Sequence, residues 1–63
     1  MNAEDKERAE NVALLRKATA LSGNSWVGAV FHDAANDLDA NRDVADLESI
    51  LADARETVKE SEQ

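Results

Sequence analysis

The sequence predicts an all-α protein, either a small three-helix bundle or a helical hairpin with a looser N-terminal helix. The chain contains no proline and only two glycines, Gly23 and Gly28. Ala, Leu, Glu and Arg are plentiful and favour helix, and the apolar residues recur at intervals of three and four without the alternation of a strand. We expect a single domain over residues 1–63, with helices at 3–22, 25–38 and 43–60.

Capping residues mark the first two helix boundaries. Asn2 is followed three residues later by Asp5, a variant of the capping box at the start of the first helix. The stretch SGNS separates the first two helices. Within it, Gly23 suits the left-handed position that ends a helix, and Asn24 or Ser25 suits the next N-cap.

The apolar faces predict how the helices pack. The face of the first helix is short, and we expect its first two turns to fray unless a partner covers them. The second helix has the widest face and should be the central helix. The third helix has Asp43 as its predicted N-cap. Its apolar residues recur at the three- and four-residue spacing typical of helical bundles. The predicted faces are Leu14, Leu15, Ala18 and Leu21; then Trp26, Val27, Val30, Phe31, Ala34, Ala35 and Leu38; then Val44, Leu47, Ile50, Leu51, Ala54 and Val58.

Composition limits the partners and the compartment. The formal net charge is -7, and binders of nucleic acid or of anionic membranes need many Lys and Arg residues. We therefore expect neither as a direct partner. The N-terminus lacks the regions of a signal peptide, which favours a cytoplasmic protein. A core of this size yields only about 3 to 5 kcal/mol, and no cysteine is present for disulfides. A metal, self-association or unusually consistent helix packing could supply the remaining stability, and of these we expect a homo-oligomer.

No catalytic site is predicted. His32 is the only histidine, and the chain has no cysteine to complete a zinc site with it. On the second helix His32 points away from the apolar face, as a surface residue would. A catalytic pair of carboxylates needs a cleft that excludes water, which so small a core does not build. We therefore expect no enzyme activity and no cofactor, with calcium as the alternative considered below.

Two surfaces are candidates for binding a partner protein. Gly28 and Ala29 are small residues on the predicted outer side of the second helix, where the first helix or a second copy could approach closely. The third helix carries an acidic ladder opposite its apolar face, and a basic groove is the natural complement of that ladder. The ladder consists of Asp46, Ser49, Asp53, Glu56 and Glu60. A solvated helix face without a partner is the other interpretation of these charges.

The stretch DLDANRDVADLE, from Asp37 to Glu48, places oxygen-bearing side chains at alternating positions. This stretch alone resembles the calcium loop of the EF-hand family, although Arg42 stands where the family has glycine. The resemblance implies the ligands Asp37, Asp39, Asn41, Asp43 through its backbone carbonyl, and Glu48. The competing interpretation is a turn, in which Leu38 ends the second helix and Asp43 caps the third.

The sequence therefore predicts a non-catalytic, acidic helical protein-interaction module, such as an inhibitor or regulator that docks on a basic surface of another protein. The alternative is a single-loop, EF-hand-like calcium-binding protein.

Overall fold

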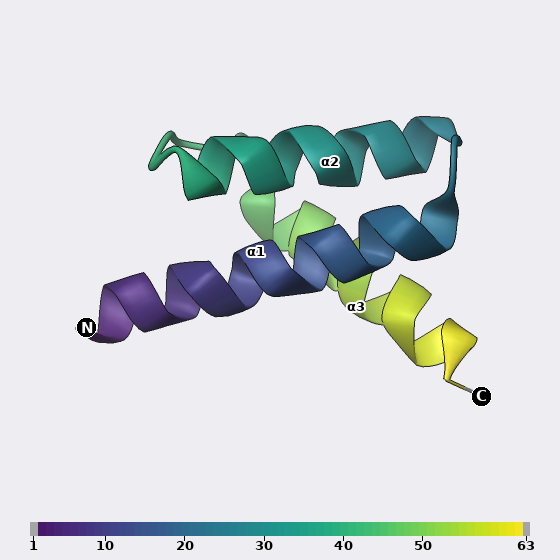
Figure 1. Ribbon diagram of the computed structural model, residues 1–63, viewed down its shortest axis with the longest axis horizontal. Helices are drawn as coiled ribbons and strands as arrows, with labels where there is room; N and C mark the ends of the chain where they lie inside the picture. The colour runs from purple at the N-terminus through teal and green to yellow at the C-terminus, as the bar shows by residue number, and fades with distance from the viewer. Residues whose placement is uncertain (1, 63) are drawn as a thin grey trace.

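Three helices form the described part of the chain, residues 2–62 of the computed structural model (Figure 1). They are α1 (Ala3–Ser22), α2 (Trp26–Asp39) and α3 (Leu47–Ser61). α1 and α2 form an antiparallel hairpin, and α3 crosses α1 obliquely, behind it in the view of Figure 1. The predicted all-α class is confirmed, in the form of a small three-helix bundle.

The start of α1 and the boundary between α1 and α2 are set by residues that the sequence analysis singled out. The Oδ1 atom of Asn2 accepts a hydrogen bond from the amide of Asp5 at 2.8 Å. Gly23 has a φ of +63° and ends α1. Ser25 is the N-cap of α2, because its Oγ atom accepts a hydrogen bond from the amide of Gly28 at 3.1 Å. These caps let the chain reverse between Ser22 and Trp26.

The predicted start of the third helix is wrong. α3 begins at Leu47 and not at residue 43, and Asp43 is an exposed residue of the connection. Asp46 occupies the N-cap position with a left-handed backbone and makes no side-chain cap hydrogen bond. Asn41 also has a positive φ, which Asn and Asp tolerate better than most residues. The longer connection allows Val44 to pack against the core before the helix begins.

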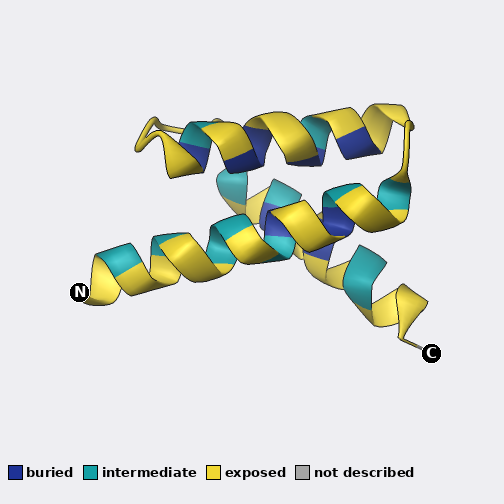
Figure 2. Ribbon diagram, viewed as in Figure 1, coloured by how far each residue is buried: buried dark blue, intermediate teal, exposed yellow. Residues whose placement is uncertain are grey.

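The core is small and contains many alanines. Phe31 and Leu15 are its largest fully buried side chains. Its complete set is Leu15, Ala18, Phe31, Ala34, Ala35, Leu38, Leu51 and Ala54. Figure 2 shows these positions on the sides of the helices that face one another. Among residues 2–62, no polar or charged side chain is buried.

The central helix is α1, and the prediction that the second helix is central is wrong. α1 packs against both other helices, whereas α2 and α3 touch only slightly and diverge toward the C-terminus (Figure 1). Trp26 is consequently 81% exposed, and Leu21 and Val27 are 45% and 42% exposed, although all three belong to predicted apolar faces. At about 100° per residue, Trp26 lies roughly 140° around α2 from Phe31, at the edge of the predicted face.

Candidate protein-interaction surfaces

The predicted acidic ladder lies on the outward side of α3. We define the acidic face as Asp46, Ser49, Asp53, Glu56 and Glu60, all of which are exposed. Leu51 and Ala54, on the other side of the helix, are buried in the core. Asp46 precedes the first turn, and the remaining members lie on the helix. The predicted separation of the acidic and apolar sides of the helix is confirmed.

The carboxylates of the acidic face form no ion pair within residues 2–62. The ion pairs found there join Arg8 to Asp5, Arg16 to Asp39, Lys17 to Glu62, and Arg42 to Asp37. Arg55 and Lys59, the cations of α3, belong to none of these pairs. The chain also has no Lys or Arg between Arg42 and Arg55. The first half of the acidic face is therefore free of neighbouring positive charge in the sequence.

The spacing of the acidic face works slightly against the stability of α3. Asp53 and Glu56 are separated by three residues and Glu56 and Glu60 by four, so that like charges are neighbours on the helix surface. Such pairs destabilise a helix by about 0.2 to 0.5 kcal/mol each. A cationic surface placed over the acidic face would relieve this repulsion.

The prediction that Gly28 lies on the outer side of α2 is wrong. It is buried, and a Cβ atom added to it would lie 2.5 Å from the carbonyl oxygen of Gly23 and 3.4 Å from the Cβ atom of Ser22. The close contact that this glycine indicates is therefore made with the end of α1 and the turn. Of the two small residues, Ala29 alone is exposed and accessible to a partner.

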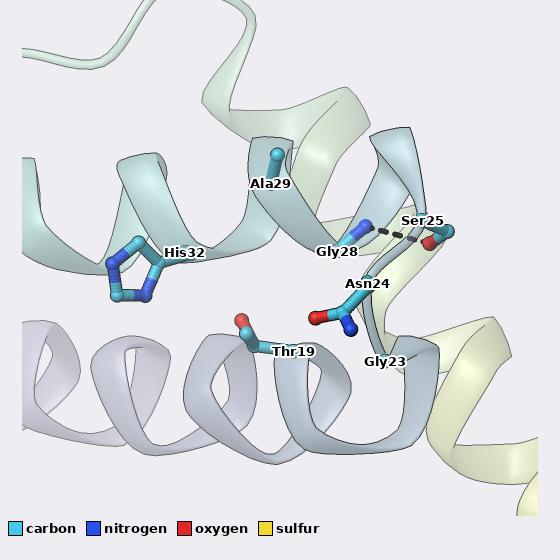
Figure 3. Close-up of a pocket in the computed structure, with 7 residues that line it drawn as sticks. All are labelled: Thr19, Gly23, Asn24, Ser25, Gly28, Ala29 and His32. Atoms are coloured by element: carbon cyan, nitrogen blue, oxygen red, sulfur yellow. Dashed lines mark hydrogen bonds between the residues drawn. The ribbon is translucent and has the colours of Figure 1, made fainter.

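A shallow groove of about 360 Å³ lies beside the turn, between α1 and α2 (Figure 3). His32 is exposed at its edge, as predicted, and its Nε2 atom lies 3.2 Å from the side-chain nitrogen Nδ2 of Asn36. Thr19 also lines the groove, and its hydroxyl donates to the carbonyl oxygen of Leu15 at 2.7 Å. These polar groups are already hydrogen-bonded within their own helices.

The five candidate calcium ligands are not brought together as an EF-hand loop. Asp37 and Asp39 lie on α2, Asn41 and Asp43 in the connection, and Glu48 on the first turn of α3. Arg42 donates to the Oδ1 atom of Asp37, at 2.9 Å from Nη2 and 3.1 Å from Nε. Within residues 2–62, no three His, Cys, Asp or Glu side chains are grouped as metal ligands would be. Calcium binding therefore stays a prediction of the resemblance alone.

Polar contacts connect the first turns of α1 to the connection between α2 and α3. Arg8 pairs with Asp5 at 3.2 Å and donates from Nη1 to the Oδ1 atom of Asn41 at 2.9 Å. An open groove of about 450 Å³ is lined by Arg8 and Asn41, together with Asn11 and Leu38. α1 is helical from Ala3 onward, and the fraying of its first turns stays a prediction.

One exposed apolar surface is missing from the sequence-based predictions. We define the apolar end as Leu21, Trp26 and Val27, which flank the turn between α1 and α2. A sequence signal for it exists, because no charged residue occurs from Ala18 to Phe31 in a chain whose charged fraction is 33%. A helical wheel hides this signal by assigning the three side chains to the core.

Comparisons with protein-family models, curated proteins and solved structures give no significant match to this chain. Within residues 2–62, no helix combines the length and the apolar character needed to cross a membrane.

Proposed function

We propose that the chain is a non-catalytic protein-interaction module whose acidic face docks on a basic surface of another protein, which it thereby inhibits or regulates. The observation that carries this proposal is the exposed row of carboxylates on α3 that form no ion pair within residues 2–62. We place this activity in the cytoplasm, with neither nucleic acid nor a membrane as a direct partner.

The energetics of docking favour a rigid acidic helix. Contacts between carboxylates and Lys or Arg are charge-assisted hydrogen bonds, about twice as strong as neutral ones. The acidic face lies on a helix that is already anchored by Leu51 and Ala54, so little backbone conformational entropy is lost when it binds. Complementary charge also accelerates the encounter of two proteins, and this effect weakens as salt is added.

The shape of the described residues supports a binding role over a catalytic one. Both grooves are open to solvent, and no polar or charged side chain among residues 2–62 is buried. Acid–base catalysis by carboxylates relies on environments that differ in their exposure to water. The exposed carboxylates of this chain share one solvated environment, which suits electrostatic recognition.

Charge reversal on α3 tests the proposal. The double variant Asp53→Lys with Glu56→Lys should bind a fluorescent lysine-rich helical peptide at least about tenfold more weakly than the wild type, measured by fluorescence anisotropy at low salt. A tenfold change corresponds to about 1.4 kcal/mol, which the loss of two attractive contacts and the gain of two repulsive ones can supply. Circular dichroism should show unchanged helicity.

The matched control is Glu7→Lys with Glu10→Lys on α1. Both glutamates are exposed, form no ion pair within residues 2–62, and have the same spacing as Asp53 and Glu56. The control changes the net charge by the same amount, so it separates the effect of position from that of total charge. An equal loss of affinity in both variants would mean that the peptide responds only to net charge, and the acidic face would have no special role.

Self-association is the second part of the proposal. The core contains only two large fully buried side chains, Phe31 and Leu15, and a domain of this length buries only about 60% of the surface that its unfolded chain exposes. A second copy would add buried apolar area that the single chain lacks. Gly28 is itself buried, so the face that it was predicted to share with Ala29 is a poor candidate for this contact.

A further inference from the structure

The apolar end exposes a large aromatic side chain to water. Trp26 is 81% exposed, and it is the only tryptophan of the chain. Trp26 is the first residue of α2 and directly follows the N-cap Ser25. Leu21 and Val27 flank it with partly exposed apolar surface. Tryptophan is among the residues that contribute most when it is buried at the centre of a protein interface.

The chain exposes more surface than its mass requires. Its accessible surface is 4444 Å², whereas the relation for folded monomers gives about 3,950 Å² at a mass of 6.8 kDa. The excess of roughly 500 Å² is close to what one subunit contributes to a small specific interface. The slight contact between α2 and α3 is consistent with this excess, because α3 runs away from the first turns of α2 (Figure 1).

Charge indicates what covers this surface. Two copies with a net charge of -7 repel each other wherever their acidic surfaces meet. The stretch from Ala18 to Phe31 carries no charge, so two copies that meet there bring no like-charged side chains of this stretch into contact. A basic protein gains no ionic contact with this stretch, because its attraction is to carboxylates on other parts of the chain.

We infer that the apolar end is the interface of a homodimer, in which a twofold axis brings the two apolar ends together and buries Trp26. This inference deepens the self-association proposed above and does not depend on the acidic face. The acidic face lies on a different helix, so a dimer presents two of them. A target with two basic sites would then be bound with avidity.

The fluorescence of Trp26 reports directly on this interface. We expect sedimentation to show the mass rising from monomer to dimer as concentration increases between about 1 μM and about 1 mM. The emission of Trp26 should shift to shorter wavelength over the same range, and its quenching by acrylamide should fall. A monomer throughout the range would overturn the inference. A dimer whose Trp26 remains fully quenchable would place the interface elsewhere and leave self-association standing.

Substitution at Trp26 separates the interface from the fold. Trp26→Glu should weaken the dimer by at least about 30-fold, while the monomer keeps its helicity because an acidic residue is favourable in the first turn of a helix. Ala13→Glu adds the same charge at an exposed position of α1 and should leave the dimer intact, as should Trp26→Phe. Dimerisation of Trp26→Glu at wild-type strength would contradict the inference. These dimerisation measurements do not involve the lysine-rich peptide. The proposed dimer and the proposed docking of the acidic face can therefore fail separately.

Discussion

Two glycines flank the turn between α1 and α2, and each meets a different physical requirement. Gly23 has φ +63° and ψ -139°, a conformation that costs a residue with a side chain about 1 to 3 kcal/mol, although a Cβ atom there would meet nothing within 4 Å. Gly28 lies in a helix, where glycine has no conformational advantage, but a Cβ atom there would lie 2.5 Å from a backbone oxygen. The first glycine is needed for backbone conformation and the second for packing.

We expect Gly28→Ala to destabilise the protein by about 1 kcal/mol, measured by urea unfolding. Alanine is better than glycine inside a helix by about 1 kcal/mol, but forcing an atom into a packed site costs about 1 to 3 kcal/mol. Ala29→Gly is the control, because it measures the helix-propensity difference at the exposed neighbouring position. If Gly28→Ala stabilised the protein by as much as Ala29→Gly destabilises it, the close contact with Gly23 would not exist.

Residues whose role depends on their sequence neighbours are the most predictable. Asn2 and Gly23 were assigned correctly, and Ser25 was one of the two N-caps considered, because a cap is formed by atoms only a few positions apart. Gly28 was recognised as a point of close contact, but its side was wrong, because that side depends on the path of the preceding turn. Trp26 was wrongly assigned to the core, because its burial depends on whether α3 reaches the start of α2.

α3 has two unlike sides. Leu51 and Ala54 hold the helix on the core, and the acidic face points to solvent. Since the like charges of the acidic face oppose helix stability, removing them should stabilise the helix and weaken binding. Such opposite effects on stability and function are typical of residues retained for binding.

Glu60→Lys tests this opposition on a single residue. It replaces a repulsive pair with Glu56 by an attractive one in the favourable order, and it places a cation in the last turn, where the helix dipole prefers one. We expect the free energy of unfolding to rise by about 0.3 to 1 kcal/mol in urea titrations, while affinity for the lysine-rich peptide falls. Glu60→Gln, which only removes the charge, should have a smaller effect on both quantities.

A decrease in stability for Glu60→Lys would mean that Glu60 serves the fold. The acidic face would then need no partner to explain it.

The connection before α3 shows where prediction of an element fails. The apolar spacing of the third helix was predicted correctly, and its outward acidic side followed from the same periodicity. Asp43 was a plausible cap on local grounds, yet α3 begins at Leu47, and Val44 packs against the core from the connection. The EF-hand resemblance did not predict the arrangement of its five candidate ligands. Arg42 pairs with Asp37, the first of them.

At the scale of the whole molecule, the helix count and class follow from composition, but the arrangement does not. α1 is central because both other helices pack on it, and its own sequence, with a short apolar face, gave little sign of this. The divergence of α2 and α3 then leaves the apolar end uncovered. No local pattern fixes a crossing angle, because it depends on how the side chains of two helices interlock.

The resulting molecule has two unlike surfaces on different elements. The apolar end carries no charge and is the proposed contact with a second copy, and the acidic face, whose carboxylates form no ion pair within residues 2–62, is the proposed contact with a basic protein. A change at one surface should therefore leave the other unaffected, which is the basis of the separate tests described above. The acidic face carries the proposed function, and its location is the central claim.

The most direct test of that claim is a proton–nitrogen NMR titration of the wild-type chain with the lysine-rich peptide. We expect saturable shifts concentrated at the amides of Ser49, Asp53 and Glu56, with little change at Glu7 or at the indole of Trp26. Added salt should reverse these shifts, because the contacts are electrostatic. Shifts spread over all exposed acidic residues, or concentrated on α1, would contradict the assignment of the binding site to α3.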